Sequence, residues 1–417
     1  MRRLGVSDRL EGKGNRTVLT MSNNYKGPPE DFAMVVPVPV VLHKEDVKTL
    51  SPDVFTRVDQ LTAPRLVEYW EQDPCDPDLG MGYEKSKGSG GSLRGRARRE
   101  ADTDGLGVKI EAQFEVGEYQ ILILSAKEST GLETWLHRNR YKIPAGAAAA
   151  MAPYVREQMK FFVAKVDIKK VRRDEQGYVV LSPLRFGYDS AELRLPVRLG
   201  LLNAPAASSP KTQAGPQAGP QVEKEPAAKQ DLIVYVLHPD KRFELANYPN
   251  VFIPTNLEVS DSVRGHFPAF YAELFDETLR RHQNRAVVTE YAWSTSSCDP
   301  CPSPPLSASD LYTLGDESFA GQKDGPGPAS RGRGGAFFGS APAYVVTRLH
   351  TRYSKDTLSE DLVFRAAEPV VGGRASWNGG TSDPGAQLQA GGGSSSFQGR
   401  YIIRHYGGLV NLRREIA

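Results

Sequence analysis

The chain has 417 residues, of which 39% are hydrophobic, and its 52 basic and 50 acidic residues leave a net charge of +2. This balance argues against a dedicated nucleic-acid binder, which usually carries a strong basic excess, and it gives no electrostatic reason to expect a membrane-surface partner. No apolar run approaches the roughly 18 residues that a helical membrane span needs, so no transmembrane segment is expected.

Low-complexity stretches divide the chain. The 40 glycines and 30 prolines cluster, and such composition buries too little apolar surface to offset chain entropy. Within one stretch the sequence Gln-Ala-Gly-Pro at 213–216 is repeated at 217–220. Long disordered inserts are therefore expected near residues 81–106, 204–230, 321–341 and 372–399. Strand-like segments resume directly beside them, which favours loops of one folded unit.

The first predicted elements are two strands and two helices. Thr17–Met21 is strand-like, and Phe32–Val41 carries two prolines that favour an edge strand. A helix is expected from Ser51, the N-cap, through Leu61. Pro64 is expected to begin a second short helix that carries Leu66–Trp70.

A hairpin and two helices are predicted next. Val108–Val116 alternates apolar and polar residues and turns at Gly117 into Tyr119–Ser125, which is typical of an antiparallel hairpin. Helices are expected over Ser129–Leu136 and Ala145–Met159.

Further strands and one strongly amphipathic helix complete the pattern. The strands are expected at Phe161–Asp167, Leu193–Leu199, Asp231–Leu237, Ala286–Trp293, Tyr344–Leu349, Leu362–Ala366 and Tyr401–Arg404. The helix Phe267–Leu279 is expected to bury a stripe that includes Phe270 and Leu274. Helices and strands do not alternate regularly, so the fold class is predicted as α+β, with a mainly antiparallel sheet or sheets and packed helices.

No known catalytic constellation is present. The sequence contains no phosphate loop, no H-E-x-x-H, no G-x-S-x-G elbow and no kinase set. The histidines show no ligand-like pair four residues apart: they are His43, His137, His238, His266, His282, His350 and His405. Asp73–Asp78 is interpreted as a proline-braced loop, and the arginines at 94–99 and 331–333 as solvated inserts. Hence no catalytic, cofactor-binding or metal-binding residue is predicted, and no cofactor or nucleic acid is expected.

The chain contains three cysteines, an odd number that cannot all pair with one another. Cys298 and Cys301 flank an Asp-Pro pair, which favours a sharp turn, and they are the candidate structural disulfide. A metal half-site, redox catalysis and free thiols are the alternatives for this C-x-x-C spacing. Cys75 has no third partner and is expected to be an unpaired thiol.

Several sequence segments, in their order along the chain, resemble a bacterial family catalogued as the domain of unknown function number 2330. The segments are Phe32–Pro39, Tyr141–Pro144, Met159–Val163, Leu195–Gly200, Asp231–Tyr235 and Val288–Trp293. The resemblance covers residues 15–315 outside the inserts, which is the predicted α+β domain. Residues 316–417 are then a Gly/Ser-rich tail region with a few short strands that could join the main sheet.

This resemblance implies an extracytoplasmic protein of the periplasm, the envelope or the secreted fraction, and it transfers no catalytic residue. Family members usually begin with a signal peptide and a cysteine-containing segment. The printed chain shows neither, so the resemblance implies an N-terminally truncated member in which the natural mate of Cys75 lies upstream.

Two functions from different classes follow. The first is a non-enzymatic secreted or envelope protein that binds or scaffolds an unidentified partner. The alternative is a hydrolase with an unrecognised carboxylate site that uses residues such as Glu290 or Asp240. A pocket with two convergent acids of shifted pKa would favour the enzyme, and a shallow surface with apolar patches would favour the binder.

Overall fold

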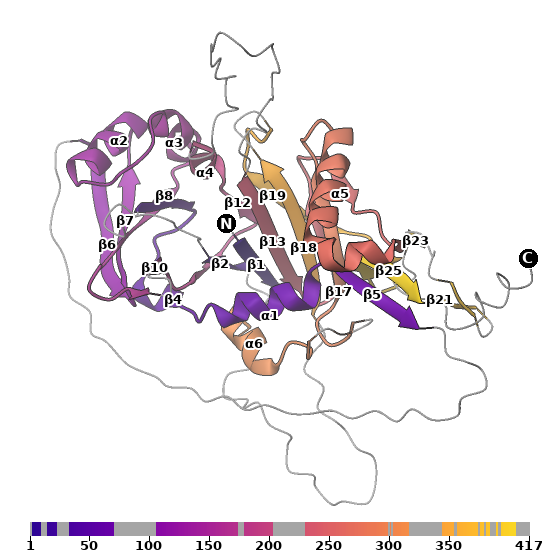
Figure 1. Cartoon of the computed structure of the whole chain (residues 1–417). Coiled ribbons are helices and arrows are strands. Elements are labelled where there is room, and N and C mark those ends of the chain that lie inside the picture. The colour runs from indigo at the N-terminus through magenta and orange to yellow at the C-terminus, as the bar shows by residue number, and fades with distance from the viewer. Residues whose placement is uncertain are drawn as a thin grey trace, which may run out of the picture.

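The protein was analysed as a computed structural model. The structure describes residues 2–9, 15–22, 33–70, 106–173, 179–202, 230–298, 301, 303–316, 344–353, 357–373, 376–378, 381–383, 389–390 and 393–405. Helices cover the faces of mostly antiparallel sheets, so the predicted α+β class is confirmed (Figure 1).

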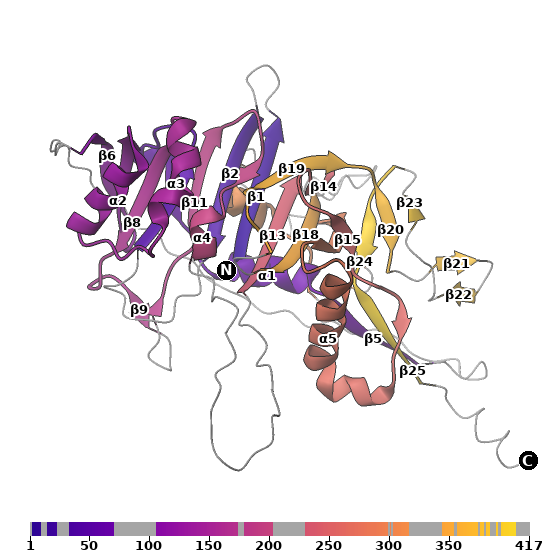
Figure 2. The same ribbon diagram turned by 90° about the horizontal axis from the view of Figure 1, so that it is seen from above.

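A four-stranded antiparallel sheet forms one side of the molecule. Its strands, in spatial order, are β3 (Ala33–Val38), β8 (Lys160–Val166), β7 (Tyr119–Ala126) and β6 (Val108–Val116). The expected hairpin is therefore confirmed as β6 and β7, and β3 is an edge strand as its prolines indicate. Helices α2 (Ser129–Arg138) and α3 (Ala147–Arg156) lie together on one face of this sheet, where Trp135, Tyr154 and Phe161 are buried in one cluster (Figure 2).

An eleven-stranded sheet forms the centre of the molecule. Its spatial order is β23-β20-β24-β17-β18-β13-β1-β2-β11-β4, and β15 pairs with β17. The strands are β1 (Arg2–Arg9), β2 (Asn15–Ser22), β4 (Val47–Thr49), β11 (Leu184–Asp189), β13 (Gln230–His238), β15 (Asn250–Phe252), β17 (Val287–Ser294), β18 (Val345–Tyr353), β20 (Val370–Gly372), β23 (Gln389–Ala390) and β24 (Ser396–Gln398). The central pair, β13 with β18, is antiparallel over nine residues.

Two helices cover neighbouring parts of the same face of this sheet. Helix α1 (Asp53–Thr62) and helix α5 (Phe267–Arg281) both lie in front of the central strands in Figure 1. Phe55 of α1 packs with Tyr235 of β13, and Phe275 of α5 packs with His350 of β18. The strip of sheet between the two helices is where the candidate site lies.

Smaller elements complete the described fold. They are β5 (Arg65–Trp70), β9 (Arg172–Arg173), β10 (Val179–Val180), β12 (Arg194–Leu195), β14 (Arg242–Leu245), β16 (Leu257–Glu258), β19 (Leu362–Ala367), β21 (Ser376–Asn378), β22 (Thr381–Asp383), β25 (Arg400–His405), η2 (Lys44–Asp46), η3 (Asp261–His266), α4 (Arg198–Leu202) and α6 (Ala308–Leu314). Among these described helices, none is long and apolar enough to cross a membrane.

Two predicted elements are wrong in type. Leu66–Trp70 is not a helix: it lies in strand β5, which pairs in parallel with β25 over residues 65–70 and 400–405. The pairing partner is more than 300 positions away, so a local pattern could not reveal it. Only Arg194–Leu195 of the expected strand Leu193–Leu199 is a strand, and Arg198 begins α4.

The amphipathic helix is present, but its buried stripe is shifted. Phe275, Thr278 and Leu279 are the buried residues of α5. Phe270 and Leu274, expected at the centre of the stripe, are only half-buried. The aromatic ring of Phe270 instead packs edge-on against the ring of Tyr401 in strand β25.

The expected inserts fall mainly outside the described residues. Those near 81–106, 204–230 and 321–341 lie there almost entirely. The stretch 372–399 differs from the expectation at its end, because β24 is buried and pairs with β17 and β20 in the large sheet. The division of the chain at residue 315 stays a prediction, although β18 and β24 follow that residue and lie inside the large sheet.

Candidate functional site

A row of three basic side chains lies on one face of the central strand β18. Successive strand residues point to opposite faces, so Arg348, His350 and Arg352 share a face. This face lies under α1 and α5. Arg348 and His350 are 6% and 7% exposed, so their charges are buried and require partners.

Glu290 reaches this row because β17 carries a bulge. Thr289 pairs with Leu349 and Tyr291 pairs with Arg348, which leaves Glu290 as an extra residue between them. A bulge redirects the side chain of the inserted residue. The Glu290 carboxylate, which is fully buried, thereby meets the basic row.

Every partner of the Glu290 carboxylate is close. Arg348 Nε donates to Glu290 Oε2 at 2.5 Å, and His350 Nδ1 lies 2.7 Å from Oε1. The Tyr271 hydroxyl of α5 donates to the same Oε1. Such charge-assisted hydrogen bonds offset the large cost of burying a carboxylate.

The network continues in two directions to the covering helices. On one side, Arg348 Nη1 donates to Asp59 Oδ1 of α1 at 2.6 Å, and the Tyr235 hydroxyl donates to the same oxygen at 2.6 Å. Helix α1 is therefore tied to the sheet by charge as well as by apolar packing.

The other direction runs through the outer half of the row. His350 Nε2 lies 3.2 Å from Asp231 Oδ1, and Arg352 Nε donates to that oxygen at 2.8 Å. Arg352 Nη1 donates to Asp276 Oδ1 of α5 at 2.7 Å. The ring of Phe275 stacks on the imidazole of His350 with 4.0 Å between centroids, and so closes the network from outside.

The surroundings shift the pKa values in a consistent way. Burial alone would raise the pKa of Glu290, but His350 and Arg348 lower it to about 2. Burial alone would lower the pKa of His350, but Glu290 and Asp231 raise it above its ordinary value. Burial and the neighbouring Glu290 raise the pKa of Tyr271 well above its ordinary value. The arrangement is thus a set of ion pairs in which the surroundings favour the ionised form of Glu290 and the protonated form of His350.

A second buried carboxylate, Asp361, lies before β19. It is 2% exposed and accepts from the Tyr154 hydroxyl at 2.5 Å, from Arg194 Nη2 at 2.9 Å and from the Val197 amide at 3.0 Å. Arg198 Nε lies 3.8 Å away. Asp361 therefore joins α3, β12 and α4 to the C-terminal part of the chain.

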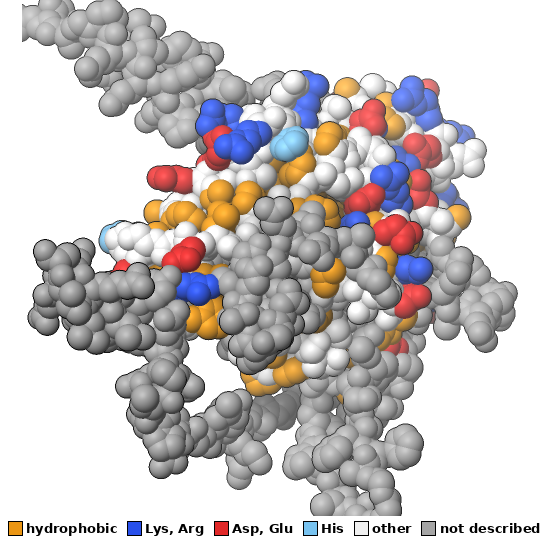
Figure 3. All heavy atoms as spheres, turned by 90° about the vertical axis from the view of Figure 1, so that its right-hand side faces the viewer, with side chains coloured by type: hydrophobic (Ala, Val, Ile, Leu, Met, Phe, Trp, Pro, Cys, Tyr) orange, Lys and Arg blue, Asp and Glu red, His pale blue; other side chains and the backbone are white. Residues whose placement is uncertain are grey.

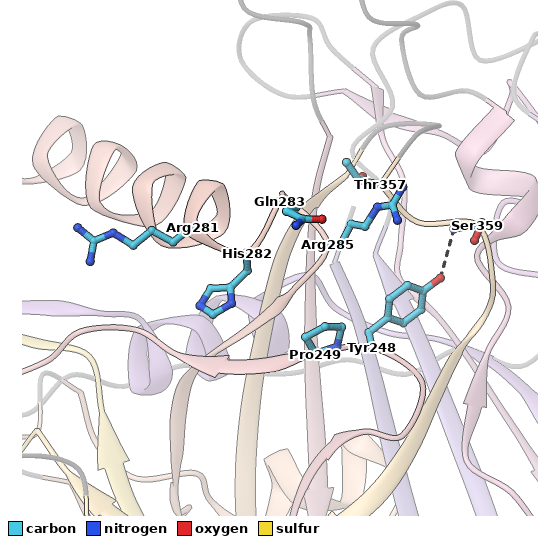
Figure 4. A pocket seen from close by; sticks show the side chains of 8 residues that line it. All are labelled: Tyr248, Pro249, Arg281, His282, Gln283, Arg285, Thr357 and Ser359. Carbon is cyan, nitrogen blue, oxygen red and sulfur yellow. Dashed lines mark hydrogen bonds between the residues drawn. The ribbon is translucent and has the colours of Figure 1, made fainter.

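Two open hollows lie at the surface of α5. One, of about 560 Å³, surrounds the end of the helix and is lined by Tyr248, Pro249, Arg281, His282, Gln283, Arg285, Thr357 and Ser359 (Figure 4). The other, of about 530 Å³, is lined by Glu273, Asp276, Glu277, Arg280 and Asn284. Among the described residues, Asp276 is the one that both lines a hollow and belongs to the buried network.

The structure separates the two carboxylates considered for a hydrolase. Glu290 is buried in the network, whereas Asp240 lies in the turn between β13 and β14 with a 68% exposed side chain, beside His238. The histidines are spread over several elements. Among the described residues no group of three or more His, Cys, Asp or Glu side chains is arranged to hold a metal ion.

The cysteine residues are placed in part. Cys298 and Cys301 lie together as a disulfide, with 4.9 Å between their Cα atoms. Their oxidation state in the protein as it is made stays a prediction. Cys75, Asp73–Asp78 and the arginines at 94–99 and 331–333 lie outside the described residues.

Sequence reasoning missed the basic row and its partners. A signal was available: Arg348, His350 and Arg352 alternate with Thr and Leu residues in a strand-like segment. Three basic residues at a spacing of two indicate one charged strand face, which must be solvated or paired. The identity of the acid that pairs with them depended on the bulge in β17.

Comparison with known proteins places the first half of the chain in a family. Residues 8–210 match the family model described as an uncharacterized protein conserved in bacteria (DUF2330). This part of the chain belongs to the DUF2330 family. No curated protein and no solved structure was found to be similar.

The DUF2330 match is shorter than the resemblance drawn from the sequence. The segments Asp231–Tyr235 and Val288–Trp293 lie beyond residue 210. The DUF2330 region supplies β2, β4 and β11 of the large sheet, the whole four-stranded sheet and helix α1. Within the buried network it contributes Asp59, and the remaining charged residues come from positions after 230.

Proposed function

We propose that this protein is a non-enzymatic, extracytoplasmic binding protein of the bacterial envelope. The observation that carries the proposal is the state of its strongest acid–base pair. Glu290 and His350 are buried under Phe275 and are fully engaged in ion pairs. A substrate cannot reach groups that are closed in this way.

The same observation weighs against the hydrolase alternative. A general acid needs a raised pKa so that it holds a proton near neutral pH. The pKa of Glu290 is lowered to about 2, which keeps it ionised. Its oxygens already accept from Arg348, His350 and Tyr271. These features stabilise the fold, and they leave Glu290 without the proton that a general acid must donate.

The open surfaces suit recognition. On the face shown in Figure 3, hydrophobic side chains are exposed between acidic and basic ones. Elsewhere among the described residues, large apolar side chains such as Ile168, at 53%, are exposed. The hollow at the end of α5 adds a concave site with basic and hydroxyl side chains. Mixed surfaces with hollows of this kind are typical of binding sites.

Export is the second part of the proposal. It is supported by the family resemblance and by the closeness of Cys298 and Cys301, because disulfides persist in oxidising compartments. The protein should be fractionated from its native cells, denatured without reduction and its thiols counted. One free thiol, from Cys75, is expected. Three free thiols would contradict the export proposal.

The non-enzymatic part is tested with chromogenic esters, phosphate esters and glycosides. The wild-type protein and the Glu290→Gln variant should both show no turnover above a heat-denatured control. Asp240→Asn, an exposed carboxylate, is the matched variant. Turnover that disappears in Glu290→Gln while circular dichroism shows a folded protein would replace the binding proposal with the hydrolase.

A further inference from the structure

We infer that the hollow at the C-terminal end of α5 binds an acidic sugar, meaning a carboxylated or phosphorylated monosaccharide unit. This inference rests on the proposed binding function and names its ligand class. The hollow has a volume of about 560 Å³, within the range of small-molecule sites.

Three segments that are distant in sequence form its walls. They are the turn that follows α5, the segment before β15 and the segment before β19 (Figure 4). The Tyr248 hydroxyl accepts from the Ser359 and Glu360 amides at 3.2 Å and 2.9 Å, which fastens two of the walls together. Pro249 is fixed by its carbonyl, which accepts from the Val287 amide at 2.9 Å.

The turn after α5 sets the directions of the remaining side chains. Gln283 and Asn284 both have a φ of 56°, a left-handed conformation that residues other than glycine adopt rarely. Hydrogen bonds donated by the backbone amides of His282 and Asn284 to the Leu279 carbonyl hold this turn. In Figure 4, Gln283 and Arg285 consequently lie close to Thr357 across the hollow.

The lining is positive. Arg281, His282 and Arg285 border the hollow, and its described lining contains no carboxylate. Arg281 is paired with Glu277 at 2.7 Å and points away from the other lining side chains. Arg285 has no carboxylate partner among the described residues, so its guanidinium is available to an anion.

The donor set indicates which anion. A guanidinium binds carboxylate or phosphate oxygens through two parallel hydrogen bonds, and Gln283, Thr357 and Ser359 add amide and hydroxyl groups. The C-terminal end of α5 carries the negative end of the helix dipole, which disfavours an anion. A small inorganic anion would therefore bind here more weakly than a larger acidic molecule that makes further contacts. The ring of Tyr248 and Pro249 offer an apolar wall that suits the body of a sugar ring.

Isothermal titration with glucuronic acid, glucose 6-phosphate, glucose and inorganic phosphate tests the inference on the full chain. At least one of the two acidic sugars should bind, and glucose should bind at least roughly tenfold more weakly. Arg285→Gln should weaken acidic-sugar binding roughly tenfold, about the value of one charge-assisted hydrogen bond. Arg280→Gln is the matched control, because Arg280 lies in the last turn of α5, five positions before Arg285, but lines the other hollow.

Each of the other possible results contradicts a specific part of the inference. Absence of binding by both acidic sugars overturns the ligand assignment and leaves the proposed envelope function in place. Equal binding of glucose, or of inorganic phosphate, overturns the joint recognition of anion and ring. Equal losses in Arg285→Gln and Arg280→Gln would show that the hollow is not the binding site. Hydrolysis of glucose 6-phosphate would overturn the non-enzymatic proposal while it supported acidic-sugar recognition.

Discussion

Two buried carboxylates stabilise this molecule in different ways. Glu290 takes both of its cationic partners, Arg348 and His350, from the adjacent strand. Asp361 takes Tyr154 and the Val197 amide from positions 207 and 164 residues earlier in the chain. The register of two adjacent strands brings the partners of Glu290 to it, whereas the packing of distant segments brings the partners of Asp361 to it.

The difference teaches where charge supports the fold. Around Glu290 the pairing of β17 with β18 itself brings the charges together, so the network strengthens a sheet that apolar packing already forms. Asp361 instead joins the DUF2330 region to the part of the chain that follows it. Removing the first should weaken the whole fold, whereas removing the second should loosen the contact between two regions.

The largest effect is expected for Arg348→Met. This change leaves the Glu290 carboxylate buried beside a weaker set of partners, and breaking a buried ion pair costs roughly 3–5 kcal/mol of unfolding free energy. Urea denaturation measures the loss. Arg352→Met is the control and should cost about 1 kcal/mol or less, because its partner Asp231 is 50% exposed on the side chain. Similar costs for the two variants would contradict the role assigned to burial.

A second large effect is expected for Phe275→Ala, which opens the network to solvent. Phe275 is 1% exposed and stacks on His350, so truncation should cost roughly 3–5 kcal/mol. Phe270→Ala is the matched variant on the same helix and should cost clearly less, because Phe270 is only half-buried. The same urea series gives both values. A larger loss of unfolding free energy for Phe270→Ala than for Phe275→Ala would support the buried face of α5 that the sequence alone predicted.

The Glu290 network should also make stability depend on pH. The pKa of Glu290 is about 2 in the folded protein against an ordinary value of 4.5, so its stabilisation is complete above pH 4.5 and is lost as the pH falls towards 2. A shift of this size corresponds to roughly 3 kcal/mol. The pKa of His350 is raised from 6.5, so its contribution is complete below pH 6.5 and is lost as the pH rises through the higher folded value.

Thermal unfolding across pH checks this dependence. Stability should be greatest between about pH 4.5 and 6.5 as far as these two groups decide it. Glu290→Gln should flatten the acid limb, even though Asp231, whose pKa is also lowered, still contributes there. An unchanged acid limb in a folded Glu290→Gln variant would show that other carboxylates control the loss.

The smallest effect is expected for Asp361→Asn, which keeps the shape of the side chain and removes its charge. Its partner Arg194 is 24% exposed on the side chain and retains Glu157, so the cost should be about 1–3 kcal/mol. Hydrogen exchange should accelerate at β12 and β19 and stay unchanged at β17 and β18. Uniform acceleration through both sheets would contradict the view that Asp361 acts as a tie between regions.

The sequence determined the local elements of this protein. Alternation in Val108–Val116 and the turn at Gly117 into Tyr119–Ser125 predicted the hairpin correctly, and the prolines near Pro37 predicted the edge strand correctly. These signals depend on neighbours a few positions apart. The ordered segments up to residue 210 also led to the correct family. Leu66–Trp70 was misassigned because its strand partner lies at the other end of the chain.

Only the tertiary structure decided the candidate sites. The spacing of Arg348, His350 and Arg352 is readable in the sequence, but their counter-charges Glu290, Asp59 and Asp231 are on three other elements. Their meeting depends on a one-residue bulge and on two helices that cover the same sheet face. The hollow at the end of α5 likewise joins three separate segments. Local periodicity specifies the face on which a side chain lies, whereas register and packing between distant segments specify what that side chain meets.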